Sequence, residues 1–202
     1  FGFTGTPKNK TIEMFGTPDE TGIPKPFHTY SMKQSIGERF TLDVLQNYST
    51  YERMFRLVKK IEDDPRFPER TSKKKLLRVV DEHPHNVQEK VRTILDHFHK
   101  HTRHQIQGKG RGMVVVSSRR LCVLYTQEMR KQLHEMGDPY NCLVGFSGNV
   151  KLDGKEFTES NLNPGVTDIP KSFKLPQNRI LVVSNKFQTG FDEPFLHTMY
   201  VD

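Results

Sequence analysis

The sequence predicts an α/β fold, in which a parallel β-sheet flanked by helices follows a mostly helical region. Two observations predict this order. Before Gly108 the apolar residues recur at intervals of three to four, as in helices, whereas after Arg111 short apolar runs alternate with a helical stretch. Strands separated by helices pair in parallel through right-handed crossovers. The 202 residues, 34% of them hydrophobic, suit one large domain or one domain with a linker region.

The first part of the chain contains few strand signals. Residues 1–26 are rich in Thr, Pro and Gly, so we expect a loop or linker there. We expect a short strand from Phe27 to Met32. Apolar residues at helical spacing then predict a helix over Ser35–Ile61, with an interruption near Asn47–Thr50.

Another helix is expected before the sheet. Asn86 followed by Glu89 is typical of an N-cap with its capping partner, and the helix is expected to end near Gln107. Histidines lie along one flank of it, at His97, His101 and His104. A histidine pair at i and i+4 can bind a metal, but no acidic ligand stands at a useful spacing. We therefore interpret this flank as a solvated polar surface and predict no metal site.

Apolar runs after Arg111 are expected to form the sheet: Met113–Val116, Cys142–Phe146, Ile180–Val183 and Thr198–Val201. Between the first two runs, Ser117–Met136 carries an apolar stripe at helical spacing and is followed by Gly137, a stop signal. The segment Ser147–Arg179 has no strong period. Because long structureless loops are uncommon in compact domains, we expect short helices around Thr158–Leu162 and Pro170–Phe173.

Composition narrows the class of protein. The 31 Lys and Arg residues against 24 Asp and Glu give a net charge of +7, which favours an anionic partner such as nucleic acid. Cys122 and Cys142 are isolated, so neither a disulfide framework nor a zinc site is indicated, and a reducing cytoplasm fits best. No apolar run is long enough to span a membrane, and no signal-peptide pattern opens the chain, so no membrane partner is expected.

Polar residues gather where the predicted strands end. In an open parallel sheet these positions lie along one edge, so hydroxyls, backbone amides and a guanidinium would face a common groove. Such groups bind phosphate oxygens without reading bases, as in proteins that follow a nucleic-acid backbone. Each residue also has a purely structural alternative, since a serine can cap the next helix and a glycine can form a turn. The clusters are Ser117, Ser118 and Arg119; Ser147, Gly148 and Asn149; and the stretch Ser184–Asp192.

Longer phrases of the sequence resemble a known family. They are FGFTGTP at residues 1–7, YSMKQSI and FTLDVLQNY between Tyr30 and Tyr48, MVVVSSRR at 113–120, VGFSG at 144–148, and LVVSNKFQTGFDEPFLHTMYVD at the end. Together they cover most of the chain, and the last phrase is highly specific. On these phrases the chain resembles the R (restriction, or motor) subunit of type I restriction endonucleases, a superfamily 2 DNA translocase.

The resemblance implies roles for individual residues. FTGTP is similar to helicase motif III, in which Thr4 and Thr6 would couple the nucleotide state to the grip on DNA. MVVVSSRR is similar to motif IV, FSG to the backbone-binding motif that follows it, and SNKFQTGFDEP to motif V. In motif V, Gly190 and Asp192 would lie at the ATP site, with Asp192 facing the ribose. The residues implied in DNA binding are Ser117, Ser118, Arg119, Ser147, Gly148, Ser184 and Lys186, with Arg119 and Lys186 as secondary candidates.

Chemistry is compatible with the two nucleotide-site roles. Gly190 permits close backbone approach or a positive φ, and the Asp192 carboxylate can accept hydrogen bonds from sugar hydroxyls. The alternatives are a plain tight turn at Gly190 and a turn residue before Pro194 at Asp192.

The resemblance also implies a domain organisation. Residues 1–26 would be the end of a first motor domain with a linker, residues 27–107 a mostly helical connecting region, and residues 108–202 a second RecA-like motor domain, truncated at its C-terminus. Because the chain opens without Met and stops directly after an apolar run, we expect it to be a piece of a longer polypeptide.

Several motifs of such a motor are absent from the sequence. It contains no GxxxxGK[ST] loop, no acidic Mg²⁺ motif and no arginine-finger motif, so no catalytic residue is assigned and the chain is not expected to hydrolyse ATP or cleave DNA alone. ATP and Mg²⁺ would be cofactors of the intact subunit. Its partners would be double-stranded DNA and the modification and specificity subunits. Alternatives are another superfamily 2 helicase and a noncatalytic nucleic-acid-binding or subunit-docking module. A metabolite-binding Rossmann domain is more distant, since no GxGxxG follows a strand.

Overall fold

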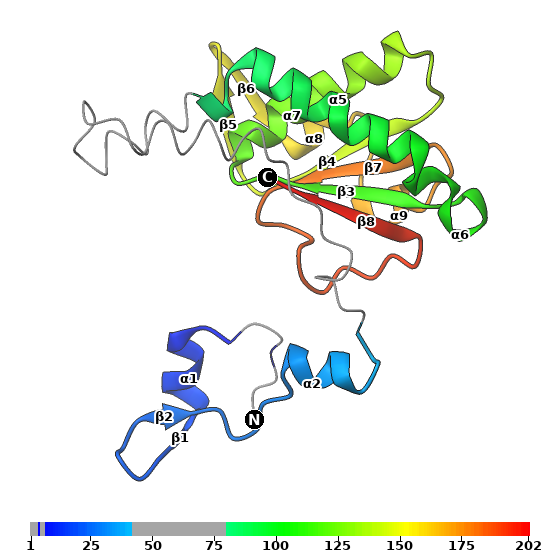
Figure 1. Ribbon diagram of the computed structural model, residues 1–202. Coiled ribbons are helices and arrows are strands. Elements are labelled where there is room, and N and C mark those ends of the chain that lie inside the picture. Colours follow the sequence, from blue (N-terminus) through cyan, green and yellow to red (C-terminus); the bar gives the residue numbers. More distant parts are fainter. Residues whose placement is uncertain (1–3, 5–6, 42–79) are drawn as a thin grey trace, which may run out of the picture. The chain divides into compact units, whose positions relative to one another are not determined.

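A computed structural model describes residue 4, residues 7–41 and residues 80–202 (Figure 1). The chain divides into two compact units, Phe1–Leu57 and Val58–Asp202. Thr6 and residues 42–61 of the helix predicted over Ser35–Ile61 lie outside the described residues. Between residues 38 and 41 the helix prediction is wrong, because the helix ends at Gly37 and Arg39 has a φ of 63°. The predicted domain boundaries after residues 26 and 107 stay predictions.

The described part of the first unit is small and built from short elements. It contains helix α1 (Asn9–Phe15), strands β1 (Thr17–Pro18) and β2 (Pro24–Lys25), which pair antiparallel, and helix α2 (Met32–Gly37). Helix α1 was missed by the loop prediction for residues 1–26.

The strand predicted from Phe27 to Met32 is wrong, because a capping box starts a helix there. The Ser31 hydroxyl accepts from the Gln34 amide, and the Gln34 side chain accepts from the Ser31 amide. These two local hydrogen bonds satisfy amides that a helix start leaves unpaired, so they favour the helix over an extended strand.

The second unit is built on a parallel sheet. Its strands lie in the order β4 (Asn141–Gly145), β7 (Asn178–Val183), β3 (Arg111–Val115) and β8 (Leu196–Val201), and every neighbouring pair is parallel. The four predicted strands and their parallel pairing are confirmed. The two central strands are almost wholly buried, which explains why their sequences are continuous apolar runs rather than alternating ones.

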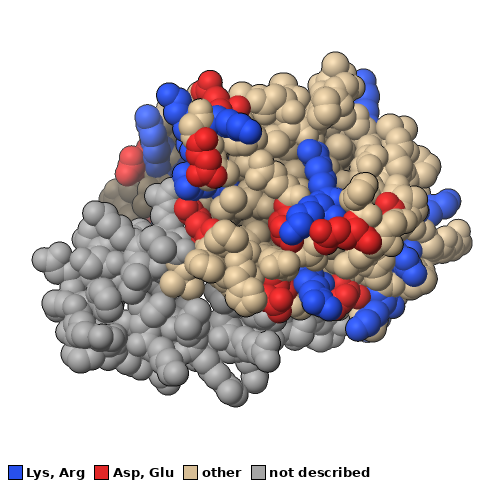
Figure 2. All heavy atoms as spheres, turned by 90° about the horizontal axis from the view of Figure 1, so that it is seen from above, with Lys and Arg blue, Asp and Glu red and all other residues tan. Residues whose placement is uncertain are grey.

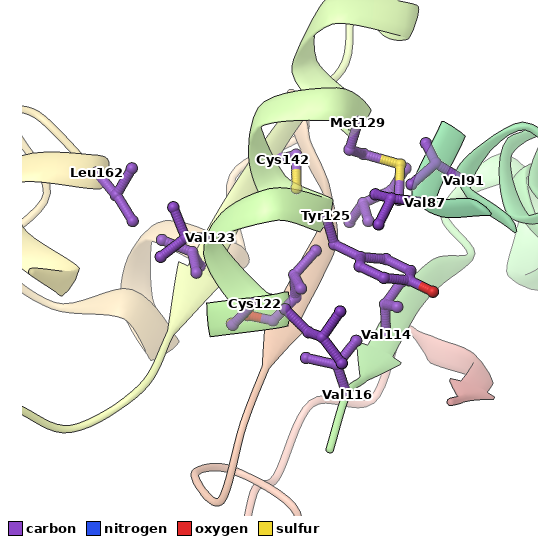
Figure 3. Packing of buried hydrophobic residues seen from close by; sticks show 14 of the residues in the cluster. Val87, Val91, Val114, Val116, Cys122, Val123, Tyr125, Met129, Cys142 and Leu162 are labelled. Carbon is purple, nitrogen blue, oxygen red and sulfur yellow. The ribbon is translucent and has the colours of Figure 1, made fainter. Parts of the chain in front are cut away.

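Helices cover both faces of this sheet. Helices α5 (Pro84–Lys100) and α7 (Arg119–Glu135) pack on the face that carries Val114, Val144 and Val182. Figure 3 shows Tyr125 and Met129 of α7 pointing toward α5 and β3. The opposite face carries Met113, Leu143 and Leu181 and is covered by the short helix α9 (Ile169–Phe173), as the alternation of side chains along a strand requires.

The start and end of α5 differ from the sequence prediction. His83, not Asn86, is its N-cap, and Pro84 occupies the first turn. The Asn86 side chain donates to the Val80 carbonyl at 3.0 Å, so it fastens the preceding segment instead. A proline at the first helical position has no amide to satisfy, which favours this earlier start.

After α5 the chain does not continue as one helix to Gln107. A 3₁₀ turn, η2 (Thr102–His104), is followed by α6 (Gln105–Gly108). Ile106 and Gln107 have positive φ angles of 50° and 57°, which a regular right-handed helix excludes.

Between β4 and β7 the predicted short helices are confirmed as α8 (Glu159–Leu162) and α9. A hairpin was missed, formed by β5 (Asn149–Leu152) and β6 (Lys155–Thr158). Its turn residues Asp153 and Gly154 have φ angles of 51° and 74°. An Asp-Gly pair between short strands is a strong hairpin signal that the sequence contained.

Among the described helices, none has the length and apolar character needed to cross a membrane.

Candidate functional site

The candidate site lies at the carboxyl edge of the parallel sheet. Val115 of β3 is level with Val183 of β7, which is level with Gly145 of β4. The segments that follow these strands therefore begin side by side. This edge gathers the first residues of all three predicted clusters: Ser117–Arg119, Ser147–Gly148 and Ser184–Lys186. Asn149 of the second cluster begins strand β5.

The segment after β3 leads directly into α7. The Ser118 hydroxyl accepts from the Leu121 amide at 3.1 Å, so Ser118 is the N-cap of this helix, the structural alternative considered for it. Ser117 is exposed beside it. Both serines lie where the partial positive charge of a helix start favours an anion.

Arg119 links the segments after β3 and β4. Its Nη1 donates to the Ser147 carbonyl at 3.2 Å while the side chain stays exposed. Gly148 makes this approach possible, since its φ is +81° and a β-carbon there would lie 2.9 Å from Arg119 Nη1. A guanidinium carries five N–H donors, so most of the donors of Arg119 remain available at this edge.

Ser184 follows β7 and is more deeply placed than predicted. Its amide donates to the Gly145 carbonyl at 3.1 Å, and the residue is only 1% exposed. Its hydroxyl has no hydrogen-bond partner among the described residues. A phosphate contact by Ser184 would need the loop after β7 to shift, and leaving the hydroxyl unpaired costs about 1–3 kcal/mol.

Lys186 is held by an acidic residue that the sequence analysis did not identify. Its ammonium lies 2.8 Å and 2.7 Å from the two carboxylate oxygens of Glu159, the first residue of α8, and 4.9 Å from the ring centre of Phe187. The same carboxylate accepts from the Phe146 amide at 2.9 Å. Glu159 therefore joins the segments after β4 and β7, and only its place at a helix start marked it in the sequence.

After Lys186, the connection between β7 and β8 crosses the sheet face that carries Leu143 and Leu181 and ends at the opposite edge. Phe187, with a φ of 59°, packs its ring on Gly145, and Phe191 lies 5.0 Å from Phe187 between ring centres. Glu193 then bonds Arg111, the first residue of β3, at the opposite edge. Asn185 also has a positive φ, of 53°. The nine-residue stretch is thus not one cluster, because a parallel strand must begin at the amino edge.

The two residues predicted at the ATP site lie along this connection. Gly190 has a φ of +70° and open space where a β-carbon would be, and Asp192 is exposed. The structure does not bring them next to Ser117 or Ser147. Thr4 belongs to the other unit, and Thr6 is outside the described residues.

His97, His101 and His104 are all exposed, as predicted, and His97 also contacts Tyr200 of the edge strand β8. His97 Nδ1 lies 3.0 Å from the Tyr200 hydroxyl, and its ring centre lies 4.9 Å from that of His101. Burial, together with the nearby His101 and His197, lowers the pKa of His97. His104 accepts from Arg103 Nε at 3.2 Å, in the tautomer that leaves its Nε2 unprotonated. No group of three potential metal ligands occurs within residues 7–41 and 80–202.

Cys122 and Cys142 are free thiols in the core. Burial raises the pKa of Cys142 to about 12 and raises that of Cys122 further. Both thiols are therefore expected to be protonated at neutral pH.

Beyond this edge, a shallow cavity of about 400 Å³ lies beside α8, between Glu159, Asn163 and Ile169. None of the residues predicted from the sequence lines it. The face of the molecule in Figure 2 shows Lys and Arg interspersed with Asp and Glu, so that face is not uniformly basic.

Sequence comparison gives an independent indication. The chain is similar to type I restriction enzyme endonuclease subunits. It is 31% identical over 110 residues to the MjaIXP endonuclease subunit of Methanocaldococcus jannaschii, an alignment that covers 53% of the chain and 10% of that protein. It is 25% identical over 232 aligned positions to the MjaVIIIP endonuclease subunit of the same organism, covering 99% of the chain and 22% of the relative.

The chain thus spans about a tenth and about a fifth of these two curated relatives. No family model matches it.

Proposed function

We propose that the chain is part of the DNA-translocating subunit of a type I restriction enzyme, and that residues 80–202 belong to its second RecA-like motor domain. One observation carries the proposal: the segments after β3, β4 and β7 meet at one edge, where Arg119 bonds the Ser147 carbonyl. The similarity to restriction endonuclease subunits supports the same conclusion.

The edge suits the phosphates of double-stranded DNA. The exposed guanidinium of Arg119, the hydroxyls of Ser117 and Ser147 and the start of α7 are all donors to anionic oxygens. Groups of this kind bind phosphate oxygens without reading base edges. They would hold the DNA backbone irrespective of sequence, as a translocase requires. Recognition of a particular sequence is left to the specificity subunit, which with the modification subunit is a proposed partner.

The residues of this chain can form only part of a nucleotide site. Gly190 leaves room for close approach, and the exposed Asp192 carboxylate can accept from ribose hydroxyls. The sequence has no loop for the phosphates and no acidic Mg²⁺ motif. In the intact subunit, bound ATP and Mg²⁺ would supply the free energy of phosphoryl transfer. The residues of this chain would hold the sugar side, and other domains would hold the phosphates and the metal.

The test is DNA binding and DNA-stimulated ATP hydrolysis by the intact subunit that contains this chain, with Arg119→Gln as the variant. We expect the affinity for duplex DNA to fall about 3–10-fold, and the slope of log K against log salt to fall by about 1. Arg92→Gln, at an exposed position on α5, is the matched control and should change neither. Duplex binding that is equal in wild type and Arg119→Gln would contradict the proposal. Binding without ATP hydrolysis would favour the noncatalytic DNA-binding module.

A further inference from the structure

Glu159 is the counter-anion of Lys186, one of the residues predicted from the sequence to bind DNA. Both of its carboxylate oxygens contact the Lys186 ammonium, at 2.8 Å and 2.7 Å. The side chains of Lys186 and Glu159 are 31% and 26% exposed, so the pair is accessible to solvent and to a ligand. Because the pair is only part-buried, water still solvates both partners and reduces the net stability that the pair contributes.

A phosphate that binds Lys186 while the ion pair is intact is repelled by the Glu159 carboxylate. An oxygen placed on the remaining donor of Lys186 would stand close to the Glu159 carboxylate, and two anions at that distance repel each other. The cheaper arrangement is an exchange, in which the ammonium turns from the carboxylate to the phosphate. Lysine permits this, since its charge sits at the end of a flexible stem.

We propose that Glu159 is an affinity-determining residue that competes with DNA phosphate for Lys186 and so limits the grip of this edge on duplex DNA. The inference rests on the proposed function. Glu159 also accepts a hydrogen bond from the Phe146 amide, next to Ser147. The carboxylate that would release Lys186 is therefore bonded to the segment after β4. A limited grip suits a protein that must release each phosphate before taking the next.

The Glu159→Gln variant removes the negative charge of the side chain but keeps nearly the same shape. The glutamine oxygen still accepts from the Phe146 amide, but the anion that holds Lys186 is gone. The matched control is Glu135→Gln, which removes the same charge from the exposed last residue of α7, at the opposite edge of the sheet. Lys186→Gln and the double variant complete a mutant cycle.

The experiment measures binding of a labelled duplex of arbitrary sequence to the intact subunit over a range of salt concentrations. We expect Glu159→Gln to raise the affinity about 3–10-fold at low salt, Glu135→Gln to leave it unchanged, and Lys186→Gln to lower it. In the Lys186→Gln background, Glu159→Gln should have no effect beyond that of Glu135→Gln.

The failures of the two proposals are distinguishable. If the wild-type subunit does not bind the duplex, the proposed function fails and this inference fails with it. If the wild type binds but Glu159→Gln gives no gain, or gives the same gain without Lys186, only the inference is overturned. Thermal unfolding checks the fold of each variant. If Glu159→Gln does not fold, Glu159→Asp replaces it, because it moves the carboxylate away from Lys186 by one methylene. We expect a smaller gain in DNA affinity from Glu159→Asp. No gain in affinity would reject the competition between Glu159 and phosphate for Lys186.

Discussion

Arg111 and Glu193 form a buried ion pair that fastens the end of the β7–β8 connection to the first residue of β3. Arg111 Nη1 lies 3.0 Å from Glu193 Oε1, and the two side chains are 3% and 1% exposed. Arg111 also donates to the Lys174 carbonyl at 2.8 Å. The second carboxylate oxygen of Glu193 has no hydrogen-bond partner in the described part of the chain. The pair therefore stabilises one path of the connection that carries Gly190 and Asp192.

Removing one partner of this pair should destabilise the fold strongly. Glu193→Gln leaves the Arg111 charge buried without its counter-ion, and we expect a loss of about 3–5 kcal/mol in the free energy of unfolding. Urea denaturation followed by circular dichroism measures it, with the exposed Glu135→Gln as control. Replacing both members with apolar residues, Arg111→Met with Glu193→Leu, should recover much of the loss. A loss below about 1 kcal/mol for Glu193→Gln would show that the charge is not isolated from water.

Protonation of His97 should weaken the contact between α5 and β8. Its pKa is lowered in the folded protein, first by burial and then by the nearby His101 and His197. The unfolded chain thus binds this proton more readily, so the contribution of His97 to stability is complete above about pH 6.5 and is lost as the pH falls toward the lower, folded pKa.

The check is the unfolding midpoint of the chain at pH 7.5 and pH 5.5. In His97→Gln, which can keep a hydrogen bond to the Tyr200 hydroxyl, we expect a smaller fall in stability between these values than in wild type. The exposed His134→Gln, at the end of α7, should retain the wild-type fall. An identical fall in the His97 variant would mean that other groups cause the acid sensitivity.

Gly145 should tolerate no side chain, because the Phe187 ring fills that place. A β-carbon at position 145 would lie 2.9 Å from two ring carbons. Gly145→Ala must therefore displace Phe187, and overpacking of this kind costs about 1–3 kcal/mol. Gly37→Ala is the control, since a β-carbon there meets nothing within 4 Å.

Trimming the ring provides the complementary test. The double variant Gly145→Ala with Phe187→Leu should regain stability relative to Gly145→Ala, measured by thermal unfolding. If Gly145→Ala alone is as stable as wild type, the loop after β7 does not depend on this contact.

Local sequence patterns were sufficient to predict most of the helices and strands of the second unit. The runs that became β3, β4, β7 and β8 are apolar because both faces of the sheet are covered, and α7 shows its buried stripe at Leu121, Tyr125 and Met129. Where prediction failed, hydrogen bonds of single residues decided the outcome. Ser31 with Gln34 starts a helix in place of a strand, and Pro84 moves the start of α5 ahead of Asn86.

By itself the sequence determined the parallel α/β fold and the edge at which Ser117, Ser147 and Ser184 gather, because periodicity and strand ends are local properties. Only the tertiary structure decided which charges meet. Lys186 pairs with Glu159, which lies 27 positions earlier in the sequence, and Arg111 pairs with Glu193, which lies 82 positions later. Such pairs depend on strand order and on the path of each connection, and no local spacing of residues encodes either. Strand order and the path of the β7–β8 connection also explain why Ser184 is buried and why Asp192 lies away from the carboxyl edge.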